Sequence, residues 1–295
     1  MRFIYFKLVA TALLWGGTFI AGKIAVQTLG PFTVAFLRFA IASIALWFVV
    51  QRVHGKVPAL HRKQQIAVLR LGLTGIFGYN ALFFGGLQTV EAGRASLIIA
   101  LNPVAIALGA AIFFKDTLTP KKCTGIVISL LGALWVISRG DVFLLLSGGF
   151  GWGELMMIGC VLSWMSYTLI GKSVMQTLSP LVASAYACWV GAVLLLPAAW
   201  YEGMGPTLLN AQPAALVSAW LSVLYLGVLG SAVGFCWYYD GLKALGPAAA
   251  SAFINLVPVS AIGLAALILH EPLTPSIAGG AILVILGVSI TNRAT

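Results

Sequence analysis

Residues 15–31, WGGTFIAGKIAVQTLGP, return further along the chain as residues 164–180, WMSYTLIGKSVMQTLSP. At this shift of 149, seven of the 17 positions are identical. They are Trp15/Trp164, Gly22/Gly171, Lys23/Lys172, Gln27/Gln176, Thr28/Thr177, Leu29/Leu178 and Pro31/Pro180. Chance similarity between two Leu/Ala-rich helices would match apolar residues, so matched Trp, Lys, Gln and Pro indicate an internal repeat.

A shift of 155 extends the repeat towards the end of each half. It pairs Pro103-Val104 with Pro258-Val259, Leu118-Thr119-Pro120 with Leu273-Thr274-Pro275, Gly125 with Gly280, and Gly132 with Gly287. We therefore predict two similar halves, residues 1–146 and 147–295, that together form one membrane domain.

The composition places this repeat in a lipid bilayer. Hydrophobic residues make up 61% of the 295 residues and charged residues only 8%, and the mean hydropathy is +1.03. A soluble domain is about 45–50% apolar and about 25% charged, and a disordered chain combines low hydrophobicity with high net charge. Both classes are excluded, and we expect an all-α integral membrane protein.

A membrane-spanning helix needs about 20 mainly apolar residues. The first apolar run lacks an A-x-A-like cleavage site and is too long for a signal peptide, so we expect it to be the first span. Helix starts are predicted at Gly30-Pro31, Thr119-Pro120, Ser179-Pro180, Gln212-Pro213 and Thr274-Pro275. The ten spans we predict are 8–27, 32–50, 66–87, 95–114, 123–138, 153–171, 181–200, 214–238, 250–269 and 276–291.

The basic residues predict the orientation. The net charge of +10 would be typical of a nucleic-acid-binding protein, but these charges lie between apolar stretches, so we expect no nucleic-acid partner. Lys23, Arg94 and Arg139 lie on one side of the predicted membrane, and Arg38 lies inside the second span. The N-terminal side holds the other thirteen: Arg2, Lys7, Arg52, Lys56, Arg62, Lys63, Arg70, Lys115, Lys121, Lys122, Lys172, Lys243 and Arg293. Both termini are therefore predicted to be cytoplasmic.

Five spans in each half is an odd number, so the second half must enter the membrane from the opposite face. Lys23 then ends the first span outside, and its counterpart Lys172 ends the sixth span inside. Inverted repeats of this kind build many secondary transporters, with the substrate site near the midplane between the repeats. This pattern predicts a transporter that works by alternating access.

Several motifs then connect the chain to a known family. They are LLWGGTFIAGK (13–23), LNPV (101–104), LVPV (256–259), FFKDTLTPKKCTG (113–125) and ILHEPLTPSIAGG (268–280). With these motifs the chain resembles the drug/metabolite transporter superfamily, specifically its ten-helix EamA-type exporters, and is most similar to their aromatic amino acid exporter branch. Asp116 and Glu271 match the family's acidic position at a helix end, although Lys115 stands where the second half has His270.

The resemblance implies a bacterial inner-membrane exporter of amino acids and other small metabolites. It also implies that helices 1, 3, 4, 6, 8 and 9 surround a central cavity, with helices 5 and 10 more peripheral. No acidic residue lies at mid-depth in those six helices, so we expect a site for a neutral or zwitterionic solute. The driving force we favour is facilitated diffusion or exchange, because a conventional Asp/Glu proton relay has no carboxylate there.

The candidate substrate-binding residues are polar or aromatic side chains and small residues near the centres of those helices, together with aromatic wall residues. Polar groups in hydrocarbon tend to face a cavity or another helix, and aromatic faces favour aromatic cargo. The set is Trp15, Gly17, Thr18, Tyr79, Asn80, Phe83, Asn102, Ser163, Trp164, Tyr167, Ser231, Trp237, Tyr238 and Asn255, with Phe19 as a further wall residue and Gly16, Pro103 and Pro258 as hinge or gate positions.

Each of these assignments has a structural alternative. Asn102 and Asn255 either line the cavity or bind carbonyl groups freed by the neighbouring prolines. Trp237 and Tyr238 belong either to a gate or to an interfacial aromatic belt. The glycines at 16 and 17 form either a hinge or a close helix contact. For Glu154 and Asp240 we favour solvated helix ends.

Other site classes have little support in the sequence. The cysteines (Cys123, Cys160, Cys188 and Cys236) stand singly in apolar segments without metal-ligand spacing, so we expect buried small side chains. We find no H-E-x-x-H or G-x-S-x-G motif, and we predict no catalytic residue, metal or cofactor. An intramembrane enzyme and a channel are therefore the weaker alternatives, whereas a broad exporter of drugs or nucleobase-like metabolites is the main alternative substrate class.

Arg38 is the one basic residue predicted about two turns inside a span. Its long stem favours snorkelling of the charged group to the outer interface. The alternative is that it faces the cavity and attracts a substrate carboxylate. The partners we predict are a small molecule, most readily an aromatic or hydrophobic amino acid, and the lipid bilayer; the oligomeric state stays open.

Overall fold

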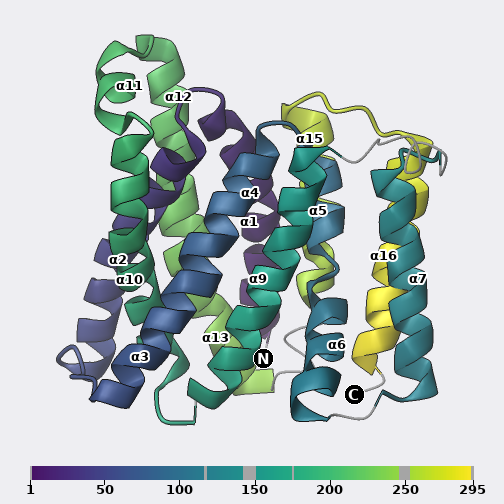
Figure 1. The fold of residues 1–295 in the computed structure, drawn as a ribbon, viewed down its shortest axis with the longest axis horizontal. Helices are drawn as coiled ribbons and strands as arrows, with labels where there is room; N and C mark the ends of the chain where they lie inside the picture. Colours follow the sequence, from purple (N-terminus) through teal and green to yellow (C-terminus); the bar gives the residue numbers. More distant parts are fainter. Residues whose placement is uncertain (1, 116–117, 142–150, 175, 246–252, 294–295) are drawn as a thin grey trace.

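The structure is a computed structural model that describes residues 2–115, 118–141, 151–174, 176–245 and 253–293. Within those ranges the chain is helical and contains no strand (Figure 1). The helices run up and down in one bundle, and α1 begins at the same end of the bundle at which α16 finishes. We call this the terminal end, and the opposite end, where α5 begins, the far end.

The first half contains α1 (Arg2–Val26), α2 (Pro31–His54), α3 (Arg62–Leu71), the π-helix η1 (Gly72–Gly78), α4 (Tyr79–Leu87), α5 (Ala92–Ile99), α6 (Asn102–Phe114) and α7 (Pro120–Ile137). The second half contains α9 (Trp152–Val174), α10 (Pro180–Tyr201), α11 (Met204–Asn210), α12 (Pro213–Leu224), the π-helix η2 (Tyr225–Val233), α13 (Gly234–Leu245), the 3-10 helix η3 (Phe253–Asn255), α15 (Leu256–Ile268) and α16 (Pro275–Arg293).

Eight of these helical segments are long and apolar enough to cross a membrane. Two shorter apolar helices follow, Leu256–Ile268 and Pro275–Thr291. Large apolar side chains such as Ile112, Tyr201 and Leu209 are exposed on the surface. A surface with this many exposed apolar side chains is typical of a protein surrounded by lipid, and the chain is a multi-pass membrane protein.

The predicted helix starts are confirmed. A proline stands at the beginning of α2, α7, α10, α12 and α16, where its missing N–H costs no hydrogen bond. Three of these helices also carry a side-chain cap: the hydroxyl oxygens of Thr119, Ser179 and Thr274 accept hydrogen bonds from backbone N–H groups in the first turn, at 3.3, 3.4 and 3.3 Å. These local signals fix where the spans begin.

The two copies of the repeated stretch fold alike. In each, a long helix ends in a short turn before a helix that starts at proline, and the N–H of Leu29 bonds the carbonyl of Ala25 at 2.9 Å just as Leu178 bonds Val174 at 3.0 Å. The first turn lies at the far end, where Gln27 faces α11. The second lies at the opposite end, where the carbonyl of Thr177 accepts from Gln64 of α3.

Helices α7 and α16 stand side by side at one edge of the bundle (Figure 1). Glycines let their backbones approach closely: a Cβ at Gly132 would lie 2.8 Å from the backbone nitrogen of Val284, and one at Gly287 would lie 2.6 Å from the carbonyl oxygen of Gly125. Small residues at such a contact are typical of helix pairs in membranes. The placement fits the peripheral position expected for these two helices.

In the described residues, four predicted spans depart from regular α-helix; in the ninth, the 3-10 helix η3 precedes α15. The π-helices η1 and η2 interrupt the third and eighth predicted spans, and the fourth is broken at Ala100–Leu101, just before Pro103. Proline supplies no N–H for the preceding turn, which accounts for the break. Interrupted helices often mark functional regions of transporters.

The burial predicted for the cysteines is confirmed at two positions and wrong at one. Cys160 and Cys188 are buried and Cys236 is partly buried, whereas Cys123 is exposed. Cys123 lies in the first turn of α7, at the edge of the bundle, where no other helix covers it.

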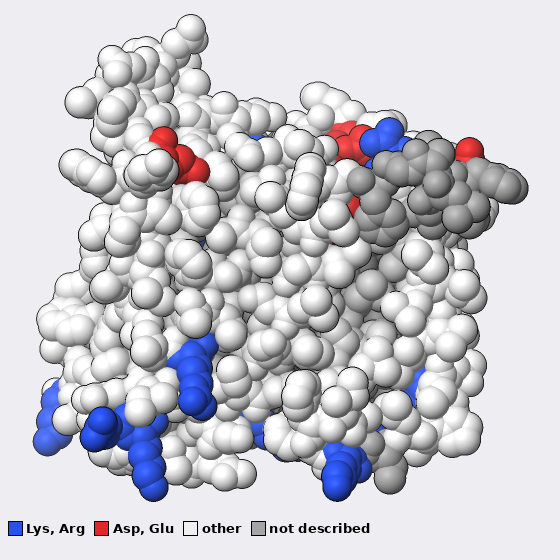
Figure 2. All heavy atoms as spheres, viewed as in Figure 1, with Lys and Arg blue, Asp and Glu red and all other residues white. Residues whose placement is uncertain are grey.

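Charges are divided between the two ends. In the face shown in Figure 2, most Lys and Arg gather at the terminal end, and Asp and Glu lie at the far end. Arg52, Lys56, Arg62 and Lys63 at the α2–α3 connection are all exposed. In this face the basic side chains thus lie mostly at the terminal end, and the cytoplasmic position of that end stays a prediction.

Candidate functional site

Five aromatic side chains form a cluster between three helices, which we call the aromatic cluster: Phe19 of α1, Tyr79 and Phe83 of α4, and Trp164 and Tyr167 of α9. The rings of Tyr79 and Phe83 stack at 5.7 Å, and Tyr79 lies 5.4 Å from Trp164. Such pairs add about 0.5–1.5 kcal/mol beyond their burial. The cluster joins the two halves, because α9 belongs to the second.

Trp15 and Tyr238 form a second ring contact, at 5.2 Å between α1 and α13. The indole N–H of Trp15 also donates to the carbonyl of Gly230 at 3.0 Å. Trp237 lies apart from this pair, because its ring contacts Phe6 at the start of α1. Trp15 is the repeat counterpart of Trp164, so each half places this tryptophan against a helix of the other half.

Arg38 lies inside the bundle and not at its surface. Its side chain is buried; Nε donates to the hydroxyl of Ser231 at 3.1 Å and Nη1 donates to Oδ1 of Asn80 at 3.2 Å. The guanidinium carbon lies 5.0 Å from the Phe39 ring and 5.9 Å from the Phe84 ring. The snorkelling prediction is therefore wrong, since partners on α4 and η2 hold the group between the helices.

Two hydroxyl candidates are bonded to the backbone. The Thr18 hydroxyl donates to the Trp15 carbonyl at 2.6 Å, and the Ser163 hydroxyl donates to the Thr74 carbonyl of η1 at 2.7 Å. The Thr74 carbonyl also accepts from the backbone N–H of Tyr79, so the Ser163 hydroxyl adds a second bond that ties α9 to η1. Both hydroxyl oxygens keep acceptor capacity for a ligand.

The candidate residues at the two predicted hinge prolines, Pro103 and Pro258, lie in different surroundings. Oδ1 of Asn102 is buried without a hydrogen-bond partner, beside Pro103 at the helix break. Pro258 is buried in α15. The side chain of Asn255 lies outside the part that the structure describes, as does Asp116. An unpaired amide oxygen in the interior is costly, which singles out Asn102 as available to a ligand.

Gly16 and Gly17 lie at tight helix contacts. A Cβ at Gly16 would overlap the Ser260 hydroxyl of α15, and one at Gly17 would overlap the Tyr225 hydroxyl of η2. That tyrosine also donates to the Leu14 carbonyl at 2.8 Å. The geometry favours the packing alternative, and the contacts of Tyr225 were missed because no pattern in the sequence pairs it with α1.

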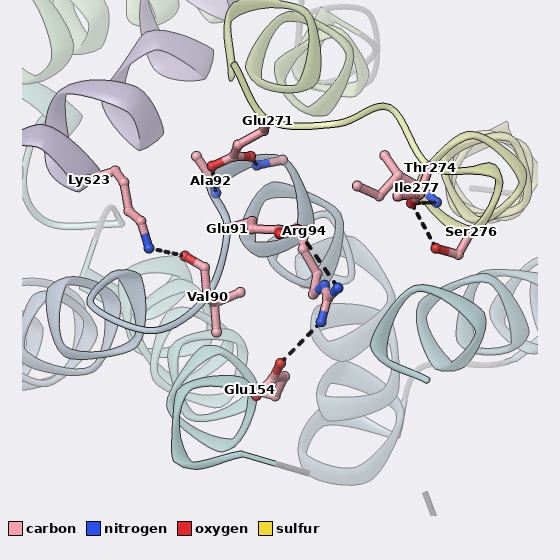
Figure 3. Close-up of polar contacts among 11 residues, drawn as sticks. Lys23, Val90, Glu91, Ala92, Arg94, Glu154, Glu271, Thr274, Ser276 and Ile277 are labelled. Atoms are coloured by element: carbon pink, nitrogen blue, oxygen red, sulfur yellow. Dashed lines mark hydrogen bonds and ion pairs between the residues drawn. The ribbon is translucent and has the colours of Figure 1, made fainter. Parts of the chain in front are cut away.

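A polar network links the two halves at the far end (Figure 3). Glu271, in the segment between α15 and α16, accepts from the backbone N–H groups of Ala92 and Gly93 at 2.8 and 3.0 Å. Lys23 donates to the Val90 carbonyl at 2.8 Å. The carboxylate therefore sits on the N-terminus of α5, where the exposed N–H groups and the helix dipole favour a negative charge.

Glu154 belongs to the same network, which corrects its predicted role as a solvated helix end. Its side chain is 12% exposed and lies 3.4 Å from Nη1 of the buried Arg94 (Figure 3). At the terminal end, half-exposed Asp240 pairs with Lys7 of α1. Each end of the bundle thus has an ion pair that joins a helix of the first half to one of the second.

The structure therefore brings candidate residues together in three groups: the aromatic cluster, with Ser163 next to Trp164 in the chain; Trp15 with Tyr238 and Thr18; and Arg38 with Asn80 and Ser231. In the described ranges, no group of three or more His, Cys, Asp or Glu could hold a metal ion.

Comparison with known proteins decides the family. The EamA-like transporter family model matches residues 2–138 and again residues 151–293. The chain belongs to this family of drug/metabolite transporters. The resemblance to the EamA-type transporters is confirmed, whereas the similarity to the aromatic amino acid exporter branch and the division into two halves stay predictions.

Several relatives are similar to this EamA-family chain over nearly its whole length. The uncharacterized transporter YyaM of Bacillus subtilis is 30% identical over 97% of this chain and 92% of its own length. A probable terminal-alkyne amino-acid exporter of Streptantibioticus cattleyicolor is 29% identical over 98% of this chain and 93% of its own. A solved crystal structure, 21% identical, covers 100% of this chain and 98% of that one with a TM-score of 0.67, which shows the shared fold.

Proposed function

We propose that this EamA-family transporter carries aromatic and other hydrophobic amino acids across the bacterial inner membrane by alternating access, in the direction of export. The aromatic cluster carries the proposal, because it brings rings from both halves into contact inside the bundle. Its flat apolar faces match the side chains of such substrates. The relative named as a probable amino-acid exporter supports the same substrate class.

The proposal includes ten spans arranged as two inverted five-helix repeats. The eight long spans together with α15 and α16 would give that number. The packing of helix pairs supports the inversion: α2 packs on its counterpart α10, and α7 on its counterpart α16. With the basic terminal end in the cytoplasm, the far end faces outside.

Alternating access then requires the two ends to open in turn. The bonds of Glu271 to α5 link the two halves at the far end, and they must break when that end opens. The broken span formed by α5 and α6 supplies a bending point at Pro103.

Competition for uptake into liposomes that carry the purified protein tests the substrate class. We expect saturable uptake of labelled phenylalanine that unlabelled tryptophan and tyrosine inhibit and serine does not, with empty liposomes as the control. Uptake of phenylalanine should also fall at least about tenfold when Tyr79 and Trp164 are both changed to alanine, because two ring contacts are lost. Equal inhibition by nucleobases and amino acids would instead favour a broad metabolite exporter.

A further inference from the structure

Arg38 is a buried cation among neutral neighbours. Its residue exposure is 9%, and its hydrogen-bond partners are a hydroxyl on η2 and an amide oxygen on α4. Among the residues that the structure describes, no carboxylate lies within ion-pair distance of it; the pairs there involve Lys7 and Arg94. A charge in the membrane is costly without a partner of opposite sign, and its usual reason is function.

The position of Arg38 along the membrane strengthens this argument. It follows the start of α2 at Pro31 by seven residues, which corresponds to about 10 Å along a helix axis. Its two hydrogen bonds reach the two spans that contain π-helices: Ser231 lies within η2, and Asn80 follows η1 and donates to the Ile76 carbonyl at 2.8 Å. Irregular helices of this kind cluster at functional sites.

The guanidinium also retains hydrogen-bonding capacity. Arginine carries five N–H donors in a planar fork, and the bonds to Ser231 and Asn80 engage one donor each on Nε and Nη1. A carboxylate is the acceptor that this fork fits best, because two parallel N–H groups can bond its two oxygens.

The ring of Phe84 connects this charge to the aromatic cluster. Phe84 lies 5.9 Å from the guanidinium carbon and 5.1 Å from the Phe83 ring, and Phe83 stacks on Tyr79. Asn80, which bonds the guanidinium, follows Tyr79 in the chain. A cation and a set of aromatic rings therefore lie together, as the two ends of an aromatic amino acid require.

We infer that Arg38 is a specificity-determining residue that binds the carboxylate of the transported amino acid, while the aromatic cluster binds its side chain. The inference rests on the proposed function and deepens it, because it makes a carboxylate a requirement for recognition. If Arg38 had only a structural role, it would hold α2 against α4 and η2. Substrates with and without a carboxylate would then bind with the same affinity.

The test compares phenylalanine with phenylalaninamide, which keeps the ring and amino group but lacks the carboxylate. In wild-type liposomes we expect the amide to compete for phenylalanine uptake about tenfold to a hundredfold more weakly, the usual effect of a charge-assisted hydrogen bond. In Arg38→Gln that preference should disappear, and Arg38→Lys should restore part of it. Arg70→Gln, which removes an exposed arginine of α3, is the matched control and should keep the full preference.

The outcomes separate the two proposals. Equal competition by phenylalanine and the amide in the wild type overturns the role of Arg38 and leaves aromatic amino acid transport standing; this comparison needs no variant to fold. An Arg38→Gln protein that keeps the wild-type preference also overturns the role. Absence of any phenylalanine uptake by the wild type refutes the proposed function, and the inference about Arg38 with it.

Discussion

Two glutamates of the second half each bind the start of a helix in the first half. Glu202, after α10, accepts from the N–H groups of Phe32 and Thr33 at 3.1 and 2.7 Å, and Glu271 accepts from Ala92 and Gly93. Both carboxylates satisfy N–H groups that a helix leaves unpaired in its first turn. Of the two, Glu271 binds the first helix of the broken span, so we assign the gating role to it.

Glu271→Gln should loosen the start of α5. The neutral amide oxygen is a weaker acceptor, and a loss of about 1 kcal/mol shifts the balance between bound and released states by about fivefold. We expect backbone hydrogen exchange over residues 92–99 to speed up by about that factor. In the matched variant Glu202→Gln, faster exchange should be confined to the start of α2. Unchanged exchange at α5 in Glu271→Gln would contradict the gating role.

For individual residues, the sequence predicted which side chains are candidates for the site better than it predicted which residues they contact. Asn80 and Ser231 are candidates because they are polar residues in apolar spans, but nothing in the chain pairs them with Arg38, which is 42 and 193 positions away. The error over snorkelling has the same origin: the length of a side chain shows where it can reach, whereas the packing of α4 and η2 determines where it lies.

Among the helices, the contact between α7 and α16 is the clearest consequence of the repeat. Gly125 and Gly132 of one helix are counterparts of Gly280 and Gly287 of the other, and all four lie against the partner helix. A Cβ at Gly280 would meet the Gly132 carbonyl at 3.0 Å. The matched glycines in the sequence therefore become a contact surface shared by both halves.

Gly132→Leu should separate these helices and destabilise the protein. Its side chain would meet the Val284 backbone, and such overpacking costs about 1–3 kcal/mol. We expect a fall of several degrees in the thermal unfolding midpoint in detergent, roughly 2–4 °C for each kcal/mol. The control is Gly263→Leu on α15, where a Cβ would have no neighbour within 4 Å and the midpoint should stay within about 2 °C. Equal effects of the two variants would refute the close contact.

The capped helix starts could be predicted from local sequence, because Pro and a preceding Ser or Thr act within one turn. The π-helices could not. Their carbonyls are stabilised by distant groups, such as the Ser163 hydroxyl on Thr74, and no short pattern encodes that contact.

For the whole molecule, hydropathy predicted an all-helical membrane protein, since long apolar runs have few other stable arrangements in lipid, and the resemblance of its motifs identified the EamA family. The contact between the two halves at the far end was not predictable in the same way. Glu271 stands out in the sequence as a family acidic position, but its contact with α5 depends on how the two halves meet.

The central claim is that this chain is a carrier for aromatic amino acids, and counterflow tests it most directly. Liposomes containing the protein are loaded with unlabelled phenylalanine and diluted into labelled phenylalanine, with no pH gradient imposed. A carrier that exposes its site to one side at a time should accumulate label transiently above its equilibrium level, because inward and outward steps are coupled. Label that only rises to equilibrium would indicate a channel, and a strict need for a pH gradient would contradict downhill exchange.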